Sequence, residues 1–123
     1  MKRLLLLSFL SVILLSACTK RDYISQPVDP REWMRTHDRG VVAYVDYYTG
    51  NYVVDTHSGF SVIESFSGYT PREYDEEYAY FSNRGLQTIY NWNGDYFTNN
   101  RIVDSWLSWS EAMYVLDQIS YGR

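Results

Sequence analysis

Apolar and polar residues alternate over much of the middle of the chain, and this pattern indicates short β-strands. From Val41 onward the period is two, so that alternate residues share a face. Similar runs at 52–56 and 60–66 follow the Gly-containing turns 49–51 and 57–59. Short strands joined by short turns predict an antiparallel meander. One face of its first strand is expected to carry Val41, Ala43, Val45 and Tyr47.

The second half of the chain repeats this pattern after a polar segment, 67–77, that is predicted to be a loop. Asn93-Gly94 is the strongest signal for a tight hairpin, because both residues tolerate a positive φ. Asn99-Asn100 is predicted to form a further turn. The strands expected on either side of these turns are 78–81, 86–92, 96–98 and 102–107.

Two segments carry helical signals instead. Asp29-Pro30-Arg31-Glu32 combines a capping Asp, a Pro suited to the first turn and an acid at the capping-box position. Ser108 and Glu111 have the same capping-box spacing, and apolar residues then recur at helical spacing until Gly122. The predicted fold class is therefore α+β: a small antiparallel meander sheet of about five or six short strands, covered by a C-terminal amphipathic helix.

The first 18 residues have a different character. Lys2 and Arg3 precede an apolar run of about 12 residues, which is too short to span a bilayer, since that takes roughly 20. The run ends in Leu15-Ser16-Ala17-Cys18, and polar residues follow at once. These four residues resemble the lipobox of bacterial lipoproteins. The resemblance implies that 1–17 is a signal peptide cut before Cys18, and that Cys18 carries lipid.

This resemblance sets the expected organisation of the chain. Residues 18–28 would be the lipidated Cys and a flexible tether, and 29–123 a single small α+β domain. Lipid on Cys18 implies stable attachment to a membrane of the cell envelope. Among lipoproteins an acid after the Cys favours the inner membrane, and Thr19 is not an acid. In a Gram-negative source the outer membrane is therefore favoured.

Charge and cysteine content exclude some classes of function. The formal net charge is −4, and loss of Lys2 and Arg3 with the leader makes it −6. An acidic domain is a poor candidate for binding nucleic acid, which requires cations that neutralise phosphates. Cys18 is the only cysteine, so the domain has no disulfide, catalytic thiol or Cys-based metal site. The sequence indicates no cofactor.

Aromatic residues make up 18% of the chain, including 13 Tyr and 4 Trp. So many Tyr exceed what the core of one small domain needs, so several are expected on the surface. Exposed Tyr is also common on solvated strands without any binding role. Candidate ligand-binding residues are those that flank the two hairpin turns: Tyr48, Tyr52, Tyr90, Trp92 and Tyr96.

Candidate chemistry is sparse. His57 with Asp55 or Glu64 offers residue types found in hydrolases, but no nucleophile elbow surrounds any Ser. The adjacent acids 75–77 are oxygen ligands of the kind that Ca²⁺ takes, but such a run is more often a solvated charge cluster. The sequence therefore predicts neither a catalytic residue nor a metal site.

The function expected from the sequence is a membrane-anchored envelope lipoprotein with a non-enzymatic binding or structural accessory role toward an envelope protein. The alternative is a glycan or peptidoglycan binding module that stacks sugars on exposed Tyr and Trp. A small hydrolase is the least favoured of the three.

Overall fold

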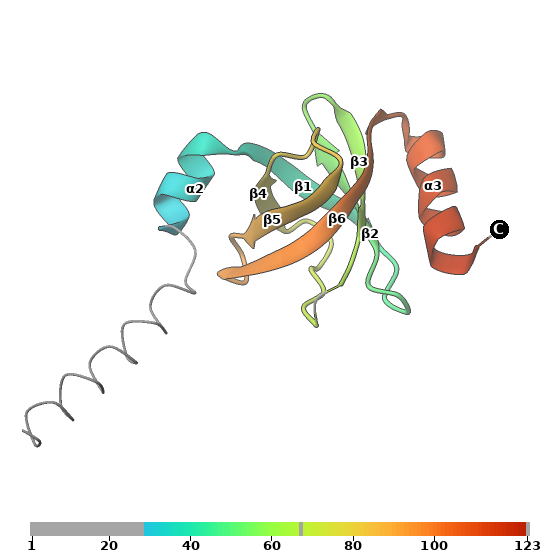
Figure 1. The fold of residues 1–123 in the computed structure, drawn as a ribbon, viewed down its shortest axis with the longest axis horizontal. Coiled ribbons are helices and arrows are strands. Elements are labelled where there is room, and N and C mark those ends of the chain that lie inside the picture. The colour runs from blue at the N-terminus through green and yellow to red at the C-terminus, as the bar shows by residue number, and fades with distance from the viewer. Residues whose placement is uncertain (1–28, 67, 123) are drawn as a thin grey trace, which may run out of the picture.

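A computed structural model describes residues 29–66 and 68–122. Within these residues the chain forms six strands and two helices (Figure 1). The predictions of a signal peptide over 1–17, lipid on Cys18 and a tether over 18–28 lie outside the described residues. The elements are α2 (Pro30–Thr36), β1 (Asp38–Val45), β2 (Tyr52–Thr56), β3 (Gly59–Glu64), β4 (Glu76–Ala79), β5 (Gly85–Asn91), β6 (Tyr96–Leu107) and α3 (Trp109–Tyr121).

The strands form a closed antiparallel barrel in the order β1-β2-β3-β6-β5-β4. Strands β1 to β3 and strands β4 to β6 are two meanders, joined by the pairs β3–β6 and β1–β4. In the second of these pairs Gly40 lies opposite Glu77. The order 4-1-2-3 makes the barrel a Greek key. The predicted fold class, an open α+β meander sheet under a helix, is therefore wrong.

Irregularities in the strands allow the sheet to curve and close. The β1–β2 register shifts between Val42 and Tyr44, so Ala43 is the extra residue of a bulge. As a result both Val42 and Val45 are buried in the barrel, which breaks the strict alternation predicted from the sequence. In β6 the register against β3 also shifts, and Trp106 there takes a φ of 61°. At Gly40 a Cβ atom would clash with the Val54 side chain, so the packing of that side chain over β1 requires glycine.

The barrel interior is the main core. Phe81, in the turn that follows β4, is buried in this core, and its carbonyl accepts hydrogen bonds from Ser61 Oγ at 3.1 Å and Ser105 Oγ at 2.6 Å. These bonds satisfy two buried hydroxyls, which would otherwise destabilise the core. The apolar side chains of the interior are Val42, Val45, Tyr52, Val54, Ile63, Ala79, Phe81, Ile89 and Ile102.

Helix α3 packs on the outside of the barrel, where Ala112 and Leu116 contact Val53 and Val62 of β2 and β3. The predicted capping box is confirmed, because Ser108 Oγ accepts from the Glu111 amide and Glu111 Oε1 accepts from the Ser108 amide. The helix thus covers one outer patch of a closed barrel rather than the face of an open sheet. It lies on the opposite side of the barrel from α2 (Figure 1).

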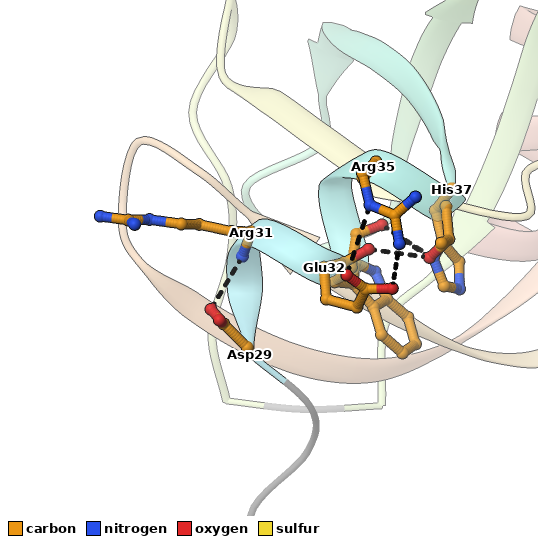
Figure 2. A network of polar contacts seen from close by, with 7 residues as sticks. Asp29, Arg31, Glu32, Arg35 and His37 are labelled. Atoms are coloured by element: carbon orange, nitrogen blue, oxygen red, sulfur yellow. Dashed lines mark hydrogen bonds and ion pairs between the residues drawn. The ribbon is translucent and has the colours of Figure 1, made fainter.

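Helix α2 begins as the sequence predicts, with the Asp29 side chain accepting from the Arg31 amide at 3.1 Å (Figure 2). Glu32 does not form the predicted capping box but pairs with Arg35, three residues on (Figure 2). Trp33 attaches the helix to the barrel, since its Nε1 donates to the Tyr78 carbonyl at 2.8 Å. Neither helix within 29–66 and 68–122 has the length and apolar character needed to cross a bilayer.

Two predicted turns differ from the structure. The β5–β6 hairpin forms, but its loop is residues 92–95 and the positive φ falls on Asp95, not on Asn93-Gly94. Asn99-Asn100 is not a turn, because β6 runs unbroken from Tyr96 to Leu107. Both asparagines pair with β5 residues in the ladder, which strand propensity alone does not indicate.

Candidate functional site

Four tyrosines line a groove between the β1–β2 turn and α3, with a volume of about 330 Å³. Tyr47 is 64% and Tyr48 96% exposed, so their rings are open to solvent. A cavity of this size with aromatic walls and a few polar groups is typical of a small-molecule site. We call it the aromatic groove. It is lined by Tyr44, Val45, Asp46, Tyr47, Tyr48, Met113, Leu116, Asp117 and Tyr121.

Asp46 organises the turn that forms one wall of this groove. Its Oδ1 accepts from the Tyr48 amide at 3.0 Å, which is the bond of an Asx turn. Its Oδ2 accepts from the Tyr121 hydroxyl at 2.7 Å and so joins the turn to the last turn of α3. Asn51 adds a second link, because its Nδ2 donates to Ser120 Oγ at 3.1 Å. The two walls of the groove are thus held together by side-chain hydrogen bonds.

The same hydrogen bonds stabilise the ionised form of Asp46. Burial raises the pKa of this carboxyl, but hydrogen bonds from the Tyr121 hydroxyl and from the amides of Tyr48 and Thr49 outweigh burial. The net result is a pKa below the ordinary value of 3.8, so Asp46 is ionised at neutral pH. The same hydrogen bond raises the pKa of Tyr121, because its proton is held by the carboxylate.

A second polar cluster lies inside the barrel around Glu77, which is 1% exposed. The Tyr52 hydroxyl donates to its Oε1 at 2.8 Å and Asn91 Nδ2 donates to its Oε2 at 3.1 Å. Burial raises the pKa of Glu77 to about 7 despite these two bonds. The prediction that acids 75–77 form a solvated run is therefore wrong for Glu77, which points inward in phase with the buried Ala79.

Beside this cluster is a second cavity, of about 410 Å³, which we call the polar hollow. Asn91 Nδ2 links the Glu77 cluster to this hollow, because it donates also to Asp75 Oδ2 at 3.0 Å. The Tyr69 ring stacks on Tyr96 with 5.0 Å between ring centroids. Glu77 is not part of the cavity wall. The residues that line the polar hollow are Thr70, Arg72, Asp75, Asn93, Gly94 and Tyr96.

The residues proposed for a hydrolase are only partly brought together. His57 and Asp55 share a wide, open depression with His37 and Asp38. Ser58 Oγ lies 3.3 Å from His57 Nε2, but no hydrogen bond among the described residues joins His57 to a carboxylate. Glu64 pairs instead with Arg101 of β6 at 2.7 Å. The orienting acid that a Ser-His-Asp arrangement requires is therefore not bonded to the histidine.

The five predicted ligand-binding aromatics are split between interior and surface. Tyr52 is fully buried and Tyr90 is 4% exposed, so neither ring offers a face for stacking. Tyr48 lines the aromatic groove and Tyr96 lines the polar hollow. Trp92 is 51% exposed in the β5–β6 loop. A binding role for Tyr48, Trp92 and Tyr96 stays a prediction, at two separate places rather than along one strip.

Metal binding has no geometric support in the part of the chain that the structure describes, where no three His, Cys, Asp or Glu side chains are grouped to hold an ion. Comparison of the chain with protein-family models, curated proteins and solved structures finds no match.

Sequence reasoning missed Tyr121 and Asp46 as partners, since they are 75 residues apart. No local pattern predicts such a contact, because it arises only when α3 folds back on the barrel. Glu77 had a usable signal, namely its period-two phase with Ala79. The adjacent acids concealed it.

Proposed function

We propose that this protein is a small lipid-anchored protein of the bacterial envelope that binds its ligand in the aromatic groove without transforming it. The observation that carries the proposal is the groove itself, where four tyrosines and Asp46 surround about 330 Å³ and two side-chain hydrogen bonds hold the walls. Such preorganised concave sites favour binding, because little ordering is needed when the ligand arrives. The lipobox-like Leu15-Ser16-Ala17-Cys18 supports the anchor.

The groove is tested by photo-crosslinking in native envelopes. A benzoylphenylalanine placed at Tyr47, in the groove, is compared with the same residue placed at Tyr114, which is on α3 but outside the groove. The two positions are matched, at 64% and 66% exposed. We expect one envelope component to be captured at 47 and not at 114. Equal capture at both positions, or none at 47, would contradict the proposal.

The anchor is tested separately with Cys18→Ala. Wild-type chain should take up a palmitate analogue and fractionate with membranes, because two or more acyl chains attach a protein stably. The variant should lose both properties. A variant that stays in the membrane fraction would show that the lipobox resemblance is misleading.

A second candidate function, glycan binding, is favoured by the polar hollow. Tyr96 supplies an aromatic side chain to its wall, and Arg72, Asn93 and Asp75 supply both hydrogen-bond donors and acceptors. Sugars need that mixture, because each hydroxyl both donates and accepts. Titration of the chain with cell-wall oligosaccharides tests this function. Binding that is lost in Tyr96→Ala but kept in Tyr47→Ala would assign glycans to the hollow rather than to the groove.

A further inference from the structure

The ionisable side chains that line the aromatic groove are acids and phenols. Its polar side chains are two carboxyl groups, Asp46 and Asp117, and the hydroxyls of four tyrosines. Of the described residues that line it, none is Lys, Arg or His. Acceptors therefore predominate among these side chains, and the Asp46 carboxylate would repel an anionic ligand.

Hydrogen-bond donors are also few. Among the described lining residues, only the phenol hydroxyls are side-chain donors, and that of Tyr121 is directed to Asp46 at 2.7 Å. A sugar would have several hydroxyl oxygens without a donor, which lowers affinity. This is the contrast with the polar hollow, where Arg72 and Asn93 provide donors.

A cationic ligand suits a groove that has many hydrogen-bond acceptors and few donors. The faces of Tyr rings attract cations through the ring quadrupole, and four Tyr side chains line this groove. Asp46 adds a negative charge at a fixed position, because Tyr121 and the Tyr48 amide hold both of its oxygens. The apolar side chains of Val45, Met113 and Leu116 are suited to the carbon part of such a ligand.

We propose that the aromatic groove binds an organic ammonium cation, that is, a positively charged nitrogen on an apolar stem. The inference rests on the proposed function, since it names the class of ligand for the same groove. The inference does not require catalysis. It predicts a positively charged ligand for the groove rather than a sugar that stacks on the rings.

The test compares two probes of one shape. Choline carries the charge, and 3,3-dimethylbutan-1-ol replaces its nitrogen with carbon. Both are titrated calorimetrically into the purified full chain in non-ionic detergent, with ring-labelled tyrosine NMR to locate the site. We expect choline to bind at least about tenfold more tightly than the neutral isostere, a difference within the range of cation–π interactions. Cell-wall oligosaccharides are the third probe.

Variants assign the binding to the groove. Tyr47→Leu should weaken choline binding about tenfold by removing a ring face, and the matched Tyr114→Leu should leave it unchanged. Asp46→Asn should weaken choline but not the isostere, and retained isostere binding shows that the groove is still folded. Equal affinity for both probes, or oligosaccharide binding in the groove, would overturn the inference and leave the proposed binding function standing. Absence of choline binding would also overturn the inference. The crosslinking experiment at Tyr47 tests the proposed function independently of choline.

Discussion

Asp46 lines the aromatic groove and Glu77 lies inside the barrel, and folding changes the pKa values of these two acids in opposite directions. Asp46 accepts from a phenol and from backbone amides of its own turn. Glu77 accepts from one phenol and from one amide group that it shares with Asp75. Burial therefore dominates at Glu77, and hydrogen bonding dominates at Asp46.

The two acids therefore differ in their state of ionisation near neutral pH. The groove carboxylate keeps its charge at any pH near neutral and is available to attract a cation. The barrel carboxyl takes up a proton near pH 7, and its ionisation lowers the free energy of unfolding.

Replacing Glu77 with Gln should remove a pH dependence of stability. The ordinary pKa of 4.5 rises to about 7 in the fold, so between these values the folded chain holds a proton that the unfolded chain has lost. The free energy of unfolding should therefore fall by about 3 kcal/mol as pH rises from about 4.5 to about 7, and level off above. Urea unfolding of wild type and Glu77→Gln across this range measures the difference. Parallel curves would show that Glu77 titrates normally.

Tyr52→Phe should destabilise the barrel because it removes the donor to Glu77 Oε1. We expect a loss of about 1–3 kcal/mol at pH 8, where the carboxylate is ionised, and a smaller loss at pH 5. The control is Tyr74→Phe, at a residue that is 83% exposed, which should change nothing. An equal loss at both pH values would mean that the hydroxyl does not interact with the charge of Glu77.

Asp46→Asn should cost about 1 kcal/mol at pH 7, since the amide accepts more weakly than the carboxylate. The pKa of Asp46 is lowered by folding, so its stabilising effect is present above the ordinary value of 3.8 and is lost as pH falls through the folded value. Wild type and variant should therefore converge in stability in strong acid. Unfolding curves that stay separated there would locate the effect in packing instead.

Tyr121→Phe should produce the smallest of these effects, because it removes only one of the hydrogen bonds to Asp46. The loss in unfolding free energy should be less than that of Asp46→Asn, with Tyr114→Phe as the matched control on the same helix. A loss larger than that of Asp46→Asn would mean that Tyr121 stabilises the chain mainly through other contacts.

The local parts of the fold could be predicted from the sequence. The strand at 52–56 has the predicted bounds, and the Ser108–Glu111 capping box is confirmed, because both depend on neighbouring residues. Closure of the barrel depends on pairs such as Gly40 with Glu77, which no local signal reports. The bulge at Ala43 likewise reversed the face of Val45, since one inserted residue shifts every side chain after it.

The candidate site was predicted least well for the same reason. The place of Tyr48 beside a turn predicts it as a candidate, and that turn does form a wall of the groove. No local signal predicts Tyr121 and Met113, because only the packing of α3 against the barrel brings them to the groove. Tyr52 flanks the same turn but points into the barrel.

The most direct test is carboxyl ¹³C NMR of the full chain, with labelled Asp and Glu, titrated from acid to mildly alkaline pH. We expect Glu77 to titrate with a midpoint near 7 and Asp46 with a midpoint below 3.8. Two midpoints near the ordinary values would contradict this expectation. The hydrogen bonds to Asp46 would then not stabilise its charge, and Glu77 would be ionised inside the barrel at neutral pH.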